Sequence, residues 1–172
     1  MTQAPIPPAS RPLLPRDYGV PQSSEGLLHW SFVSEHMQSA LNYWIATVDS
    51  NNRPHATPVW GMWLDETFYF DGSPETRRGR NLAGNSNVTV HLESGSEVVI
   101  LQGTVEQLRG VDHRPLTLRL APAYEVKYAS QNYHPDPKQW DAGGLYVVRP
   151  RLVLAWTKFP DTMTRWVFEG EA

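Results

Sequence analysis

Short β-forming runs separated by tight turns dominate residues 43–108, and this spacing restricts the fold more than any other feature of the sequence. Connections such as 50–53 and 65–67 are too short to hold a crossover helix, so the strands they join must pair antiparallel. The pattern predicts a mostly β protein with a few short helices, folded as an antiparallel barrel because closure removes exposed strand edges. The expected strands are residues 43–49, 55–64, 68–71, 88–93, 97–108, 145–148, 153–157 and 165–168.

A first helix is expected near Ser31, a good capping residue. Val33, Met37, Leu41 and Trp44 then follow at the spacing of one helix face, so this face is expected to pack on the sheet. Tryptophans are expected to fill the core. Those assigned to it are Trp30, Trp44, Trp63 and Trp140.

Local signals also predict two more helical segments and one edge strand. Residues 76–83 are expected to form a short helix, and residues 112–129 a polar helical insertion that Pro115 and Pro122 interrupt. Pro58 has no N–H to donate to a neighbouring strand, so its strand is expected at a sheet edge or a bulge.

Length and composition indicate one domain with a proline-rich extension. A chain of 172 residues can bury a sizeable core without disulfides. Six of the fifteen prolines lie in residues 1–26, which are expected to form an extended arm. Residues 27–172 are expected to form the single domain.

Several classes of protein are excluded by residue counts. With no cysteine the chain has no thiol nucleophile and no cysteine metal ligand, so any redox chemistry must come from a bound cofactor. A formal charge of -3 argues against nucleic-acid binding. Purely apolar runs such as residues 98–101 are too short for a signal peptide or a membrane span, and a cytoplasmic protein is expected. The six histidines form no metal-binding motif, so no metal site is expected.

The strongest local signal for a ligand is a cluster of arginines. Arg77, Arg78 and Arg80 lie at the start of the second predicted helix, and no acidic residue occurs between Glu75 and Glu93. Positive charge combined with the free N–H groups of a helix N-terminus favours phosphate. A solvated basic helix face is the alternative explanation.

The order of these motifs resembles the pyridoxamine 5'-phosphate oxidase-like, FMN-binding split-barrel superfamily, which includes deazaflavin (coenzyme F420) dependent reductases. The similar segments cover about residues 30–168 and lapse over 110–142. They are RPHATPVW at 53–60, FYF at 68–70, TRRGRNL at 76–82, NSNV at 85–88, PRLVLAW at 150–156 and RWVF at 165–168.

This resemblance implies a homodimeric split barrel, with residues 27–172 as its flavin-binding domain. FMN, or alternatively F420, would bind at the dimer interface, and a hydride would pass to or from a small organic substrate. The family's C-terminal Trp and Arg reach a cofactor held mainly by the partner subunit. The positions matching the family's cofactor contacts are Thr57, Pro58, Val59, Trp60, Met62, Phe70, Asp71, Thr76, Arg77, Arg78, Trp156 and Arg165.

Two departures separate the chain from pyridoxamine phosphate oxidase itself. The oxidase begins its ring-lining strand with Arg and ends it with Lys, and this chain has Thr57 and Met62 there. Two polar contacts to a riboflavin-type ring are therefore missing. The resemblance favours a smaller FMN- or F420-dependent oxidoreductase over a true pyridoxamine phosphate oxidase.

No catalytic acid or base is identified from the sequence. Tyr124, Lys127 and Tyr128, together with His55, are candidates for a substrate mouth, since variable loops on a rigid barrel carry specificity. A solvated helix face is the alternative for the first three. The alternative function is a non-catalytic split barrel that stores or senses flavin or haem, with His55 or His91 as haem contacts.

Overall fold

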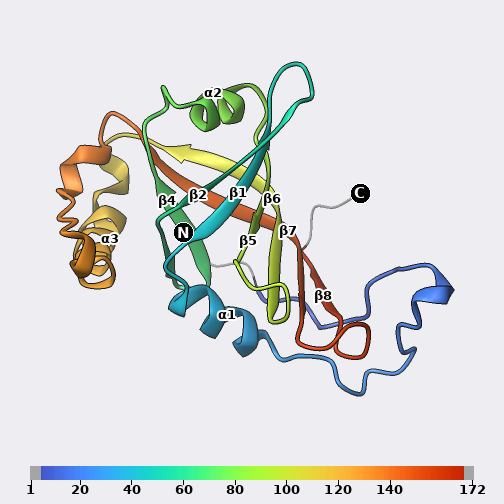
Figure 1. Cartoon of the computed structure of the whole chain (residues 1–172). Coiled ribbons are helices and arrows are strands. Elements are labelled where there is room, and N and C mark those ends of the chain that lie inside the picture. The colour runs from blue at the N-terminus through green and yellow to red at the C-terminus, as the bar shows by residue number, and fades with distance from the viewer. Residues whose placement is uncertain (1–4, 169–172) are drawn as a thin grey trace.

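A computed structural model describes residues 5–168. Figure 1 shows one curved sheet with helices at its two ends and along one side. The strands are β1 (Tyr43–Val48), β2 (Pro54–Val59), β3 (Gly61–Leu64), β4 (Thr67–Asp71), β5 (Asn87–His91), β6 (Val98–Leu108), β7 (Leu145–Trp156) and β8 (Thr164–Val167). The α-helices are α1 (Trp30–Ser39), α2 (Arg77–Gly84) and α3 (Arg114–Lys127), and the 3-10 turns are η1 (Arg16–Tyr18), η2 (Val111–His113), η3 (Ala129–Gln131) and η4 (Pro137–Trp140).

Every strand pair in the described sheet is antiparallel, as the short connections predict. The strand order is β2-β1-β5-β6-β7-β4-β3, and β8 pairs with β7 beside this path. β2 and β3 therefore lie at opposite ends of the sheet although they are consecutive in the chain. The sheet is an antiparallel half-barrel that is open between these two strands.

Two strand boundaries differ from those expected. The predicted strand 55–64 is interrupted at Trp60, because β2 pairs with β1 whereas β3 pairs with β4 at the other end of the sheet. Residues 145–156 form one strand rather than two, since β6 pairs with them along their whole length. Pro58 lies on β2, an edge strand of the described sheet, as predicted.

The core consists of two clusters on opposite faces of the β3–β4 hairpin. The main cluster lies between α1 and the inner face of the sheet and contains Phe68, Phe70 and Trp166. A second cluster lies beneath α3 and contains Met62, Tyr124 and others. Because neighbouring residues of a strand face opposite sides, the hairpin supplies side chains to both.

Several expectations for the helices are wrong. His29, not Ser31, precedes the first helical residue, and α1 ends at Ser39. Leu41 is therefore outside the helix and 54% exposed. Trp44 lies half-buried on the outer face of β1 instead of in the core.

Prolines interrupt α3 less than expected. Pro115 occupies the first turn, where its missing N–H is tolerated. Pro122 lies within the helix without ending it.

The N-terminal arm is attached to the edge of the sheet. Ser10 forms a short antiparallel bridge with Arg165 on β8. The Arg11 guanidinium donates hydrogen bonds to backbone oxygens of Asp161 and Met163 at 2.8 Å and 3.0 Å. The arm thus runs beside β8 around Ser10 and Arg11, and it then loops away from the sheet before it returns to α1 (Figure 1).

Candidate functional site

The candidate anion site begins at the turn between β4 and α2. Thr76 is the N-cap of α2: its hydroxyl oxygen accepts from the Gly79 N–H at 3.0 Å and donates to the Ser73 carbonyl at 2.8 Å. Position 79 requires glycine because the backbone of Pro74 packs closely against it: a Cβ there would lie 2.4 Å from the Pro74 carbonyl oxygen. The N–H groups of Arg77 and Arg78 have no hydrogen-bond partner within residues 5–168. They are available to an anion.

The three arginines of this helix have different environments. Arg77 pairs with Asp49 at 3.7 Å and is exposed. Arg80 donates to the Glu75 carbonyl. Arg78 makes neither a hydrogen bond nor an ion pair with any residue that the structure describes, although its guanidinium is half-buried. Arg78 is thus the arginine with donors available for a ligand.

Arg78 is held against the end of β4. Its guanidinium carbon lies 5.7 Å from the centre of the Phe70 ring. A Cβ on Gly72 would lie 2.5 Å from its Nη2, so Gly72 leaves the space that the guanidinium occupies. Burial lowers the pKa of Arg78 from its usual value. A desolvated cation at a helix N-terminus is an arrangement that binds phosphate.

The strand expected to line the cofactor ring is β2. β1 is the neighbour that pairs with it in the described sheet, so the backbone groups along its other edge are free for a ligand. Thr57 lies opposite Ile45 and shares the inner face with it, whereas Pro58 lies opposite Trp44 on the outer face. Val59 is buried in the main core.

Two of the expected ring contacts are packed under α3 instead. Trp60 stacks on Tyr128, with ring centroids 4.9 Å apart, and meets Tyr133 edge-on at 5.5 Å. Met62 is only 7% exposed and belongs to the second cluster. Phe70 is fully buried in the main core and reaches the site through its contact with Arg78.

Asp71 is hydrogen-bonded to two side chains of the segment that follows α3, a contact that the sequence analysis did not predict. Its Oδ2 accepts from the Tyr133 hydroxyl and from Trp140 Nε1 at 3.4 Å. Burial raises the pKa of the Asp71 carboxyl, and these two hydrogen bonds oppose that rise. No sequence motif marks these partners, because they lie more than sixty residues from Asp71 and meet it only through the fold.

The substrate candidates on the insertion are mostly buried. Tyr124 is 0% exposed and Tyr128 is 1% exposed, so neither belongs to a solvated helix face. The Tyr128 hydroxyl lies 2.8 Å from the Leu41 carbonyl oxygen and 2.9 Å from that of Gly61 and donates its one hydrogen to either, while its oxygen accepts from the Gly61 N–H at 2.8 Å. Lys127 is half-buried, and His55 lies on β2.

The two haem candidates face opposite sides of the sheet. His55 lies opposite the buried Thr47, and its Nδ1 is buried without a partner among the described residues. His91 lies beside Trp44 on the outer face, and its Nδ1 is 2.8 Å from the Leu92 carbonyl oxygen. One flat ligand cannot contact both from a single face.

One row of side chains across the outer face of the sheet is largely apolar. Paired residues form a continuous row across six strands, and all of them lie on the face away from the main core. This row is Pro58, Trp44, His91, Ile100, Leu154 and Arg165.

Trp156 and Arg165 lie far from the anion site of their own chain. Phe70 pairs with Tyr146, and Trp156 follows ten residues later on β7, roughly 30 Å away at the usual rise of a strand. Arg165 donates through Nε to the Ser10 hydroxyl at 3.1 Å. They can contribute to such a site only on another molecule.

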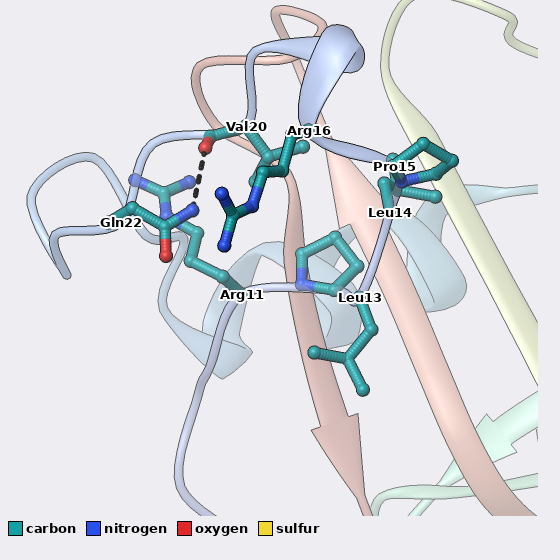
Figure 2. Close-up of a pocket in the computed structure, with 8 residues that line it drawn as sticks. Arg11, Leu13, Leu14, Pro15, Arg16, Val20 and Gln22 are labelled. Carbon is teal, nitrogen blue, oxygen red and sulfur yellow. Dashed lines mark hydrogen bonds between the residues drawn. The ribbon is translucent and has the colours of Figure 1, made fainter.

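The arm contains a pocket of about 600 Å³ lined by residues of 11–22 (Figure 2). Leu13, Leu14 and Val20 form apolar walls, while Arg16 and Gln22 are polar. It is remote from α2 and involves none of the residues expected to bind cofactor.

No helix within residues 5–168 is long and apolar enough to span a bilayer. No group of three or more His, Asp or Glu side chains in this part of the chain could hold a metal ion.

Comparison with protein families gives one match. The family model described as pyridoxamine 5'-phosphate oxidase matches residues 34–140, more than half of the chain. A search of curated proteins finds no match.

Solved structures share the fold at low sequence identity. A conserved hypothetical protein from Mycobacterium tuberculosis has a TM-score of 0.63 and 17% identity over 79% of this chain and 89% of that chain. A heme binding protein from Mycobacterium smegmatis has a TM-score of 0.59 and 19% identity over 82% of this chain and 60% of that chain. An F420 reductase has a TM-score of 0.53 and 21% identity over 76% of this chain and 98% of that chain.

Proposed function

Because the chain belongs to the pyridoxamine 5'-phosphate oxidase family, we propose that it is a homodimeric oxidoreductase that binds FMN at its dimer interface. It transfers a hydride to or from a small organic substrate. Coenzyme F420 is the alternative cofactor, supported by the likeness to an F420 reductase. The departures at Thr57 and Met62 argue against a true pyridoxamine phosphate oxidase.

One observation carries this proposal: Arg78 is half-buried and has no hydrogen bond or ion pair within residues 5–168. Its guanidinium lies next to the N-terminus of α2, where two N–H groups are also free. A half-buried cation whose N–H groups have no hydrogen-bond partner is well suited to binding an anion. Both FMN and F420 carry a phosphate that fits this donor set.

The chain's own residues would bind and orient the cofactor, and the cofactor would supply the hydride chemistry. Arg78 and the first turn of α2 would hold the phosphate, and Arg77 would add charge nearby. The free edge of β2, from Thr57 to Val59, would contact the ring through backbone groups. Trp60 is fixed by Tyr128 at the end of this strand and would exclude water.

The apolar outer face supports the dimer. Trp44, Ile100 and Leu154 lie half-buried in this row, and a second copy of the chain would cover the part of them that is open to solvent. A second copy placed there would bring Trp156 and Arg165 toward the partner's site, as the family pattern implies. A twofold arrangement would form two equivalent sites.

Cofactor binding is tested by titrating the protein with FMN and separately with F420, followed by absorbance and fluorescence. We expect one of them to bind. Arg78→Ala should weaken that binding by about 1.5–3 kcal/mol, the range for a hydrogen bond to a charged group. Arg80→Ala is the matched control, since its guanidinium is already bonded to the Glu75 carbonyl. Binding of neither cofactor would refute the proposal, and an unchanged affinity in Arg78→Ala would move the phosphate elsewhere.

A non-catalytic haem- or flavin-binding protein is the second candidate. The likeness to a heme binding protein supports it. So does His91, whose Nδ1 contact with the Leu92 carbonyl would orient the ring with Nε2 facing a ligand. A Soret band on adding haem, lost in His91→Ala, would favour this candidate. A bound flavin that is reduced but never reoxidised by any acceptor would favour storage.

A further inference from the structure

Lys127, the last residue of α3, has surroundings unlike those of the other two lysines in the chain. Its Nζ donates to the Tyr43 hydroxyl at 2.7 Å and to the Gly61 carbonyl at 3.1 Å. The same nitrogen lies 4.9 Å from the centre of the Tyr43 ring and 5.7 Å from that of Tyr128. The amine is therefore enclosed by two phenols and one backbone oxygen.

No carboxylate compensates the charge of this amine. Within residues 5–168 Lys127 forms no ion pair, whereas Lys158 pairs with Asp161 at 2.6 Å. Tyr43 and Tyr128 are the titratable groups that face it, and burial raises the pKa of both, so both phenols stay neutral. Burial also lowers the pKa of Lys127 to about 8. At pH 7 about a tenth of this amine is then uncharged, far more than for a lysine of ordinary pKa.

The neutral amine keeps its position and gains a free lone pair. An uncharged amine has two hydrogens, which match the two acceptors, Tyr43 Oη and the Gly61 carbonyl. The lone pair is then left without a partner in the described structure. Lys127 is half-buried, so part of its side chain is open to solvent, and a small electrophile would approach the amine from that side.

We propose that Lys127 is a modification site that accepts an acyl group from an activated acyl donor such as an acyl phosphate. The amine nitrogen attacks the acyl carbon, a C–N bond forms, and the C–O bond to phosphate breaks. Phosphate leaves with the electron pair, and the amine proton passes to solvent. The product is an amide, and no oxidation or reduction occurs.

Acylation changes the packing of α3 on the sheet. The amide nitrogen carries one hydrogen, so one of its two hydrogen bonds is lost, and so is the positive charge over the Tyr43 and Tyr128 rings. Tyr128 also stacks on Trp60, which connects the modified residue to the end of β2. Modification would therefore loosen the contact that fixes Trp60.

The test treats the full chain with acetyl phosphate at about pH 7.5 and measures acetylation of Lys127, Lys138 and Lys158 by peptide mass spectrometry. We expect Lys127 to react at least about tenfold faster than the exposed Lys138. Lys127→Arg should leave the other two rates unchanged. In urea the three rates should converge, because the advantage depends on the fold. Equal or faster acetylation of Lys138 or Lys158 in the folded protein would overturn the proposal.

A second measurement follows the Lys127 rate with pH. The rate should rise and level off above about pH 8, and continued increase to about pH 10 would contradict the proposal. Neither measurement needs a flavin or an electron donor. The result is therefore separate from that of the cofactor titration.

Discussion

Two charged side chains, Asp71 on β4 and Arg78 on α2, lie near the end of β4, and they have different surroundings. Asp71 is held on the α3 side by Tyr133 and Trp140, while Arg78 lies over Phe70 on the other side. The carboxylate has its hydrogen-bond partners, whereas the guanidinium has none within residues 5–168. Hence Arg78 is the side chain that we propose for ligand binding, whereas Asp71 holds the loop that carries Tyr133 and Trp140.

The pH dependence of stability tests the environment of Asp71. Burial raises the pKa of its carboxyl above the ordinary 3.8, so its favourable contribution is complete below that pH and is lost as pH rises through the raised pKa. Asp71→Asn cannot ionise and retains an acceptor oxygen. In urea unfolding, the free energy of unfolding of the variant should therefore rise relative to that of the wild type between about pH 4 and about pH 7.

Asp49→Asn is the control with the opposite sign. A hydrogen bond from the Arg53 N–H lowers the pKa of Asp49 below the ordinary 3.8, so the free energy of unfolding of the wild type should rise relative to that of this variant as pH rises to about 4, with little change from there to about pH 7. The same sign for both variants would contradict the assignment of the buried carboxyl.

At the scale of elements, α2 depends on its close contact with the preceding turn. The Thr76 cap and the Gly79 contact with Pro74 fix where the helix starts, and this start positions Arg78 and the free N–H groups. Asn81 connects the helix to β1 through a hydrogen bond of 3.0 Å to Thr47. The helix that carries the candidate anion site is therefore anchored at its start by Thr76 and near its middle by Asn81.

Alanine at two glycines of α2 should have opposite effects. Gly79→Ala places a Cβ 2.4 Å from a backbone oxygen and should lower the free energy of unfolding by about 1–3 kcal/mol. Gly84→Ala meets nothing within 4 Å and should raise it by up to about 1 kcal/mol through helix propensity. Chemical denaturation measures both, and equal effects would show that the turn yields to the added methyl group.

At the scale of the whole molecule, the apolar outer face and the anion site belong to one proposal. Trp44, Ile100 and Leu154 lie outside the two core clusters, and Arg78 has no hydrogen-bond or ion-pair partner within residues 5–168. Trp156 and Arg165 lie at the end of β7 and β8 away from α2. A second copy would cover this face and supply those two residues.

Leu154→Glu should separate the subunits. A carboxylate in the middle of the apolar row is expected to weaken the dimer at least about tenfold, equivalent to about 1.4 kcal/mol. Leu118→Glu on α3 is the control, because Leu118 is 58% exposed and away from this row. Sedimentation velocity measures the oligomer, and circular dichroism checks the fold. A wild-type monomer, or an unaffected Leu154→Glu dimer, would contradict the interface.

Local patterns predicted the elements better than their ends. Turn residues and β-rich runs were enough to place every strand region, and Thr76 was enough to start α2. The break at Trp60 could not be predicted, because residues 55–64 are uniformly β-forming and only pairing at opposite ends of the sheet divides them. Pairing with β6 likewise joined the two segments expected within 145–157.

The candidate site was predicted unevenly for a similar reason. The arginine cluster is visible as a charge pattern, but which arginine lacks a partner depends on Asp49 and Glu75. The partners of Asp71 were not predicted, since Tyr133 and Trp140 reach it only after α3 packs on β4. Trp44 was assigned to the core, yet two apolar faces on one strand indicate a second surface to be covered.

The sequence by itself determined the mostly β architecture, the antiparallel pairing and the dependence of any redox chemistry on a borrowed cofactor. Short connections and absent thiols are properties of the chain that no packing can change. The tertiary structure decided which side chains are free to act. Within residues 5–168, Arg78 has no hydrogen-bond or ion-pair partner, Lys127 is enclosed without a carboxylate, and Trp44, Ile100 and Leu154 are only half-buried on the outer face of the sheet. These properties depend on contacts between distant segments, which exist only after the chain has folded.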